Sequence, residues 1–365
     1  MIVVDAHEDL AWNALTFGRD IVLSVEEIRR REAETSVPDW NGHTLIGWPE
    51  WIRGRVGVVF TSLFAAPSRW QEGPWDTQCY ADQTEAVQLY RANLEVYRRW
   101  LEANPEKFAQ ITTRGALESV LEEWESGEVA EPRIGWILLM EGADALLEPA
   151  QAEVWYREGV RILGPAWAAT AYAGGTGEPG PLTGLGRELL REMDALGMIL
   201  DLSHLTEQGT LEAIDRYQGE VIVSHTSPLA CVPNASEPER HITDLTLDRL
   251  AERDSVMGLA LWNPFLKDGW APDQGREAVG LGDVARAIDY VCQRLGNANH
   301  IGIGSDFDGG FGLNEVPLGL DSVADLRTIG EALEPMGYTS EDIEKILGGN
   351  WLRVLRRALP ETEIA

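Results

Sequence analysis

Lysine and cysteine are scarce in this chain of 365 residues. The lysines are Lys107, Lys267 and Lys345, and none of them follows an apolar run where it could reach a strand end. The three cysteines lie far apart and form no Cys-x-x-Cys pair. A disulfide framework is therefore not expected, and a reducing compartment fits best.

A net basic charge and long apolar runs are missing as well. The formal net charge is −30, which argues against nucleic acid as a partner and against an anionic membrane surface. No apolar run approaches the roughly 18 residues that a membrane span needs. No basic segment precedes a long apolar one at the amino terminus, so we expect no signal peptide and a cytoplasmic protein.

The apolar residues that are present gather in eight short runs separated by polar turns and amphipathic stretches. The runs are 2–4, 56–64, 133–140, 160–164, 198–202, 221–223, 256–261 and 300–304. They are typical of strands buried on both faces. The clearest helical patterns between and after them are 82–104, 186–197, 207–218, 281–296 and 339–359.

Eight strands alternating with helices predict a (β/α)₈ barrel of the TIM type, forming a single domain over residues 1–365. An open doubly wound sheet is the alternative. No Gly-x-Gly-x-x-Gly motif follows the first apolar run, and its absence lowers that alternative.

Histidines and carboxylates follow five of the eight predicted strands. Active sites of such barrels form at the carboxyl ends of the strands, so these side chains are expected to converge. They are His7 and Asp9 after the first run, Glu141 after the third, His204 after the fifth, His225 after the sixth and Asp306 after the eighth. His7 and Asp9 are two positions apart and so share a face of an extended chain.

Crowded carboxylates repel one another, and two divalent cations would neutralise them. Mixed histidine and carboxylate ligands suit zinc, with manganese, iron or cobalt as alternatives. Two ions about 3.5–4 Å apart need a bridging ligand. No lysine is available for carboxylation at a strand end, so Glu141 is the bridging candidate by elimination.

Six motifs, in order along the chain, carry a family resemblance. They are DAHEDLAW, LLMEGADAL, REMDALGMILDLSH, VIVSHTS, RHITD and HIGIGSDFDGG. With them the sequence resembles the membrane (renal) dipeptidase family of binuclear zinc peptidases, in the form of a bacterial-type member without secretion signal or lipid anchor.

The resemblance implies a role for each matching residue. His7 and Asp9 would hold one zinc ion, and His204 and His225 the other, with Glu141 as the bridge. A hydroxide shared by both ions would attack the peptide bond, and Asp306 would take the proton and deliver it to the leaving amine. Arg240 would bind the free carboxylate of a dipeptide, which suits a guanidinium fork. The resemblance also implies a homodimer.

One departure from the family concerns the segment after the fourth strand, VRILGPAWAATAYAGG. Aligned on Trp167 and Tyr172, the family histidine that contacts the substrate carbonyl is replaced by Ala166. His43, on a loop, is a possible substitute. His241 and His300 are expected to be a loop residue and a structural residue at the barrel bottom.

The remaining features have plainer interpretations. Asp5 is expected to orient a ligand, Asp308 to hold its loop, and the glycine-rich segment 174–184 to form a mobile loop near the site. Two alternatives to a dipeptidase stay open: a hydrolase of another small amide, ester or lactone, and a metal-binding barrel that has lost peptidase activity.

Overall fold

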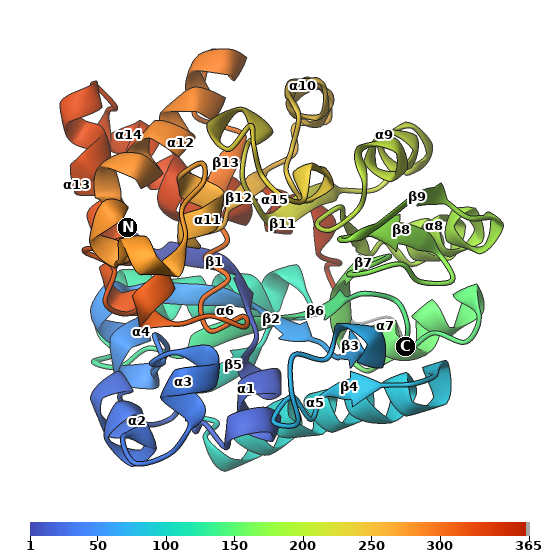
Figure 1. Cartoon of the computed structure of the whole chain (residues 1–365), viewed down its shortest axis with the longest axis horizontal. Helices are drawn as coiled ribbons and strands as arrows, with labels where there is room; N and C mark the ends of the chain where they lie inside the picture. Colours follow the sequence, from blue (N-terminus) through green and yellow to red (C-terminus); the bar gives the residue numbers. More distant parts are fainter. Residues whose placement is uncertain (363–365) are drawn as a thin grey trace.

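The computed structural model describes residues 1–362, and its centre is a closed barrel of parallel strands (Figure 1). The barrel strands are β1 (Val3–Glu8), β2 (Val56–Leu63), β6 (Ile134–Glu141), β7 (Val160–Gly164), β10 (Ile199–Asp201), β11 (Val221–Thr226), β12 (Met257–Leu259) and β13 (Ile301–Ile303). They follow one another around the barrel in chain order, and β13 closes it by pairing with β1 at Ile303 and Asp5. The predicted (β/α)₈ barrel is confirmed.

Each barrel strand is buried along its whole length, as expected where helices cover the outside and side chains fill the inside. The covering helices are α5 (Gln83–Ala103), α6 (Arg114–Ser126), α7 (Ala152–Arg157), α8 (Gly184–Leu196), α9 (Glu207–Arg216), α10 (Asp244–Glu252), α12 (Leu281–Leu295) and α15 (Asn350–Ala358). One further short strand, β5 (Phe108–Gln110), pairs with the start of β6.

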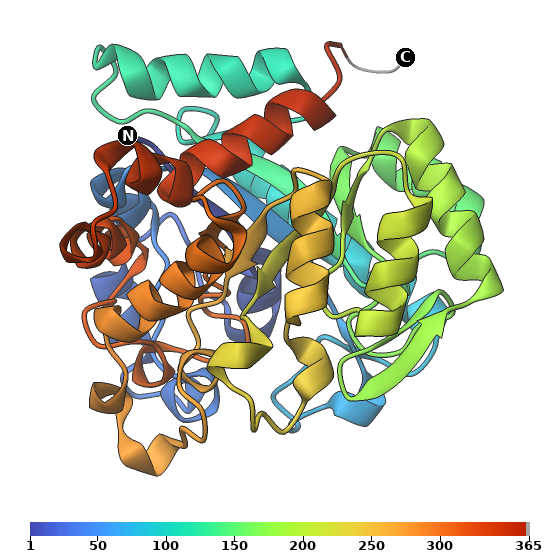
Figure 2. The same cartoon turned by 90° about the horizontal axis from the view of Figure 1, so that it is seen from above.

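The carboxyl-terminal helical segment begins where its sequence predicts. Thr339 and Asp342 form a capping box before α14 (Ser340–Glu344). A π-helical turn, Lys345–Gly349, joins α14 to α15. Helix α15 lies beside α6 (Figure 2), where Arg356 Nε donates to Glu118 Oε1 at 2.7 Å.

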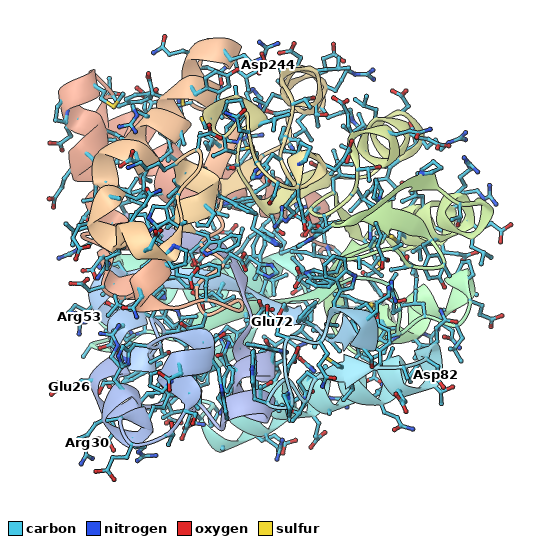
Figure 3. All side chains as sticks on the ribbon, viewed as in Figure 1. Glu26, Arg30, Arg53, Glu72, Asp82 and Asp244 are labelled. Atoms are coloured by element: carbon cyan, nitrogen blue, oxygen red, sulfur yellow. The ribbon has the colours of Figure 1, made fainter. Side chains whose placement is uncertain are left out.

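The connections at the carboxyl ends of the strands are long and carry small elements of their own. These are α1 (Leu10–Phe17), α2 (Val25–Glu32), α3 (Val37–Asn41), α4 (Trp48–Gly54), β3 (Ala66–Pro67), β4 (Cys79–Tyr80), β8 (Ala173–Gly175), β9 (Glu178–Leu182), α11 (Asn263–Leu266) and α13 (Ile329–Leu333). In Figure 3, Glu72, between β3 and β4, lies near the centre of the view, while Glu26, Arg30 and Asp82 lie toward the periphery. Within residues 1–362, no helix is both long enough and apolar enough to cross a bilayer.

Candidate metal centre

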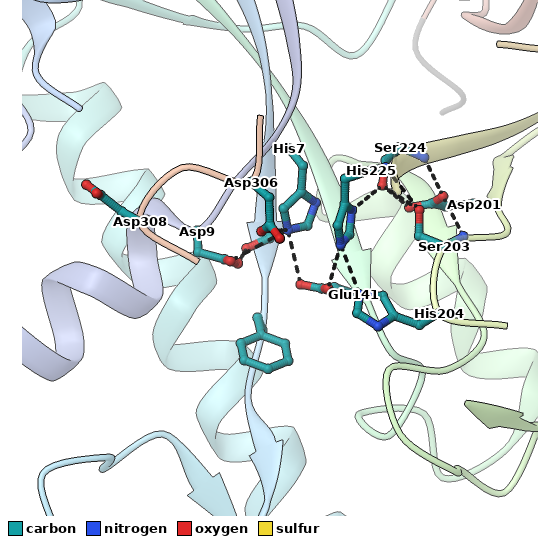
Figure 4. Close-up of polar contacts among 12 residues, drawn as sticks. His7, Asp9, Glu141, Asp201, Ser203, His204, Ser224, His225, Asp306 and Asp308 are labelled. Carbon is teal, nitrogen blue, oxygen red and sulfur yellow. Dashed lines mark hydrogen bonds and ion pairs between the residues drawn. The ribbon is translucent and has the colours of Figure 1, made fainter. Parts of the chain in front are cut away.

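Six side chains predicted from the sequence meet at the carboxyl-terminal mouth of the barrel (Figure 4). They are His7, Asp9, Glu141, His204, His225 and Asp306. All six lie in the last two positions of a barrel strand or within three residues after its end. The barrel thus brings together groups that lie as much as 299 positions apart in the numbering.

Glu141 lies between two sets of nitrogen donors. Its Oε2 atom is 3.3 Å from His7 Nε2. Its Oε1 atom is 2.8 Å from His204 Nε2 and 3.5 Å from His225 Nε2. The two carboxylate oxygens therefore face different histidines, which is the arrangement a ligand bridging two cations requires.

Asp9 and Asp306 complete the side of the cluster next to His7. His7 Nε2 lies 3.6 Å from Asp9 Oδ2 and 3.9 Å from Asp306 Oδ1. Two groups of donor atoms have spacings compatible with a metal ion, all within 4.8 Å of one another: His7, Glu141 and His225, and His7, Asp9 and Asp306.

The two histidines on the other side present their Nε2 atoms to each other at 2.9 Å. Ser224 Oγ donates to Asp201 Oδ2 at 2.5 Å and lies 2.9 Å from His225 Nδ1. Because the Ser224 hydroxyl gives its proton to Asp201, His225 Nδ1 must donate its own proton to Ser224. The Nε2 atom of His225 is then unprotonated and keeps a free lone pair. Such a lone pair beside a second ring nitrogen and a carboxylate fits a cation between them.

His204 is oriented from the segment 174–184. Its Nδ1 atom lies 2.8 Å from Thr176 Oγ1. Within residues 1–362, neither ring nitrogen of the fully buried His7 has a hydrogen-bond partner. Buried polar atoms without partners are rare, and a metal ion at Nε2 would account for one of them.

In the metal-free cluster, electrostatics favour the neutral, metal-binding form of histidine only at His204 and His225. Burial, and then the charges of His7 and Arg240, hold the pKa of His225 well below its ordinary value. Burial and Arg240 lower the pKa of His204 to about 4. Both rings are therefore neutral near pH 7, as metal ligands must be.

The opposite shift occurs at His7 and Asp306. Burial would lower the pKa of His7, but the charges of Glu141 and Asp9 raise it well above its ordinary value. Burial, with the negative charges of Asp9 and Glu141, raises the pKa of the Asp306 carboxyl. Burial also opposes ionisation of Glu141, yet His7 and His204 bring its pKa below the usual range.

Backbone conformation at two site residues is unusual. His204 has φ 67° and Asp306 has φ 59°, in the left-handed region that side chains with a Cβ rarely occupy. Such strain of about 1–3 kcal/mol persists where surrounding structure enforces it, commonly at functional sites.

Arg240 lies directly beside the cluster. It is 6 % exposed, and its Nη1 atom donates to the backbone oxygen of His225 at 3.0 Å. Its guanidinium lies 5.2 Å from the centre of the Phe265 ring. The clamp predicted for a substrate carboxylate is therefore tied to the backbone of a predicted ligand.

The other sequence predictions are placed as follows. Asp5 accepts from the Ser305 amide at 2.7 Å and from its hydroxyl at 2.5 Å, so it holds the chain before Asp306 and not a ligand ring. Asp308 accepts from Thr44 Oγ1 and the Leu45 amide and points away from the cluster (Figure 4). It holds the loop, as expected.

The three remaining histidines lie outside the six-residue cluster. His241 Nδ1 lies 2.9 Å from Ser227 Oγ, and burial lowers its pKa to about 4. His300 Nδ1 lies 3.0 Å from the backbone oxygen of Ser255, at the amino-terminal end of β13. His43 is not among the residues that line the cavity over the cluster.

A cavity that opens to solvent lies over the cluster. Trp167 lines it and lies 6.0 Å from the His204 ring, whereas Ala166 is 1 % exposed and does not line it. The side chain that faces the cavity at this strand end is therefore the indole of Trp167 and not Ala166.

Sequence reasoning missed Asp201, Ser224 and the residues that wall the cavity. Asp201 lies within the apolar run 198–202, and a carboxylate inside such a run was a detectable signal. The wall residues between β3 and β4 carry no comparable pattern, because a loop's path depends on contacts distant in sequence.

This fold and this donor cluster define the class: a metallohydrolase built on a (β/α)₈ barrel. Within it, the chain belongs to the membrane dipeptidase family (peptidase family M19), whose sequence model matches residues 1–362.

A curated relative agrees with this assignment, and two solved structures share the fold. A dipeptidase from Claviceps purpurea, tcpJ, is 27% identical over 314 residues, covering 84% of this chain and 67% of the relative. The dipeptidase AC structure has a TM-score of 0.77 at 24% identity and covers 98% and 99% of the two chains. A Rhodobacter sphaeroides metallopeptidase with a phosphinate mimic of L-Ala-D-Ala has a TM-score of 0.76 at 23% identity over 98% and 99%.

Gly309 provides a test of the Asp9 and Asp306 geometry. A Cβ at this position would overlap Asp306 Oδ1 and lie 2.9 Å from Asp9 Oδ2. Gly309→Ala should displace these carboxylates and lower the activity of the metal-loaded enzyme by roughly 10²-fold, since a shift of about 1 Å has that effect. Gly184→Ala is the control, because a Cβ there meets nothing within 4 Å. Equal activity of the two variants would contradict the assignment.

Metal affinity should rise with pH through and beyond pH 6.5. His7 has a raised pKa in the metal-free chain, so it carries a proton at neutral pH that a metal ion must displace. Lowering the pH increases the fraction of chains in which His7 is protonated. The metal affinity then falls by about tenfold per pH unit if one proton is released on binding. Chelator competition at pH 6, 7 and 8, corrected for the chelator, measures this. A flat profile would show that metal binding displaces no proton, and would contradict this prediction.

Proposed function

We propose that the protein is a metal-dependent dipeptidase that hydrolyses small dipeptides with a free carboxyl-terminal carboxylate. The observation that carries the proposal is the position of Glu141, whose two oxygens face His7 on one side and His204 and His225 on the other. The membrane dipeptidase family and the dipeptide mimic bound by the Rhodobacter sphaeroides relative support a dipeptide substrate. The D-alanine portion of that mimic supports a carboxyl-terminal D-residue.

Two zinc ions fit the donor set best. His7 and Asp9 would hold one, His204 and His225 the other, and Glu141 both. When bound, the ions would polarise the scissile carbonyl group and lower the pKa of the attacking water.

The protein's own groups would position the substrate and move the proton. Asp306 Oδ1 would accept a proton as general base and return it to the leaving amine as general acid. Its raised pKa, caused by burial and neighbouring negative charge, suits a group that must hold a proton. Arg240 would bind the substrate carboxylate through its fork of donors.

A second candidate is hydrolysis of another small amide or lactone. It is favoured by one observation: Trp167, and no histidine, faces the cavity after β7. The family contact to the substrate carbonyl would then be absent, and removing such a donor costs about 10²–10³ in rate. Comparison of dipeptides with non-peptide amides and lactones separates the two candidates.

Metal content tests the binuclear site directly. After reconstitution with zinc, elemental analysis should give close to two ions per chain. His204→Ala should lose about one, because it removes a nitrogen donor from one side of Glu141. Absence of bound metal in the reconstituted wild type would disprove the site. Light scattering on the same sample measures the predicted homodimer.

Arg240→Lys tests carboxylate recognition while retaining the positive charge. The lost fork should raise KM for free dipeptides roughly 10- to 100-fold, and the preference for free over amidated dipeptides should shrink. Arg327→Lys, at an exposed arginine, is the matched control. A wild-type enzyme that hydrolyses free and amidated dipeptides at equal rates would refute this role.

A further inference from the structure

The cavity has an upper part that the proposed chemistry does not use. Its floor contains the predicted metal ligands, but its wall is aromatic and acidic. The wall residues are Trp12, Phe64, Trp70, Trp75 and Trp167, with the carboxylates Glu72 and Asp76. Both carboxylates come from the segment between β3 and β4.

The aromatic part of the wall is braced by ring contacts. Trp75 stacks on Trp40 at 5.9 Å and on Phe17 at 5.5 Å, and it meets Trp12 edge-on at 6.5 Å. Trp70 meets Trp167 edge-on at 6.2 Å. Indole rings that line a cavity attract cations through the ring quadrupole.

Asp76 is buried in this wall with an unsatisfied oxygen. Its side chain belongs to a residue only 5 % exposed, and its Oδ1 atom finds no hydrogen-bond partner within residues 1–362. The neighbouring Cys79 thiol interacts with Asp76, whose charge contributes to raising the pKa of Cys79 to about 12, after burial. The Cys79 thiol does not neutralise the Asp76 carboxylate. A buried carboxylate without a positive partner is costly.

Glu72 adds a second carboxylate at the exposed rim. Burial and the negative charges of Asp76 and Glu315 raise its pKa. Glu315 itself accepts from Trp262 Nε1 at 2.9 Å. The charges that act on Glu72 in the described part of the chain are thus negative, and a cation is the ligand that this wall lacks.

We propose that this acidic and aromatic wall binds the basic side chain of the substrate's amino-terminal residue, so that dipeptides beginning with lysine or arginine are preferred. The inference rests on the proposed dipeptidase function. Arg240 would hold the carboxyl-terminal residue, so the amino-terminal side chain is the part left to reach the wall. The α-amine would stay near the floor, beside Asp9 and Asp306, because it is one carbon from the scissile carbonyl.

Matched dipeptides test the preference. Lysyl-alanine and norleucyl-alanine have the same side-chain carbons and differ by an ammonium in place of a hydrogen on the terminal carbon, and glutamyl-alanine reverses the charge. With the zinc-loaded enzyme, kcat/KM should be at least about tenfold higher for the lysyl than for the norleucyl peptide, and lowest for the glutamyl peptide. Equal values for the first two would overturn the proposal.

Two near-isosteric variants assign the preference to the wall. Glu72→Gln and Asp76→Asn should each lower the lysyl-to-norleucyl ratio, and the double variant should bring it close to about one. Glu331→Gln and Asp273→Asn, at exposed carboxylates, are the matched controls and should keep the wild-type ratio. An unchanged ratio in the double variant would overturn the assignment. If Asp76→Asn does not fold, Glu72→Gln and Glu72→Lys decide, the latter by reversing the preference.

Binding without hydrolysis separates this inference from the dipeptidase function. Lysine amide should perturb the tryptophan fluorescence of the zinc-loaded protein with a Kd at least about tenfold below that of norleucine amide. Glu72→Gln should reduce this difference between the two Kd values. If no dipeptide is hydrolysed but this difference appears, the proposed reaction fails and the cation site stands. Equal Kd values would refute the cation site whatever the activity.

Discussion

The dominant constraint in this structure is the close approach of like-charged groups at the barrel mouth. Glu141, Asp9 and Asp306 surround His7, and two neutral imidazole nitrogens face each other at 2.9 Å. Without cations, the raised pKa values of His7 and Asp306 and the positive charge of Arg240 reduce this repulsion. Burial of such a cluster is expensive unless positive charge enters it. The mouth is therefore organised around a ligand that the protein must acquire.

Much of the surrounding polar structure serves to hold these groups in place. Asp201 and Ser224 fix the tautomer of His225, Thr176 contacts His204, and Ser62 donates to Asp9. The left-handed backbone at His204 and Asp306 turns their side chains out of the strand direction. Supporting contacts of this kind commonly change metal affinity by about 10- to 100-fold. The strain at the two residues is offset by the barrel's extensive apolar core.

The sequence predicted the barrel and the cluster for one physical reason. Parallel strands that are buried on both faces must be apolar throughout, so the eight runs stand out, and whatever polar residue follows a run must lie at the mouth. This sufficed to place His7, Glu141, His204, His225 and Asp306 together. It did not locate the acidic and aromatic wall, because the segment between β3 and β4 follows no period. Whether residue 166 or residue 167 faces the cavity could not be predicted, because this depends on the turn at Gly164 and Pro165.

The chain's large negative charge has a different meaning at the surface and at the cavity. On the outside, carboxylates lie against arginines, as in the pairs of Arg356 with Glu118 and of Arg294 with Asp248. Such exposed pairs are worth little in stability, and they leave a weak local field. Around the cavity, the carboxylates of Glu72 and Asp76 have no such arginine among their hydrogen-bond and ion-pair contacts in the described residues. Carboxylates at the mouth that have no arginine partner concentrate cations where the metal ligands lie. The same uncompensated charge would then select both the metal ions on the floor and a basic substrate at the wall.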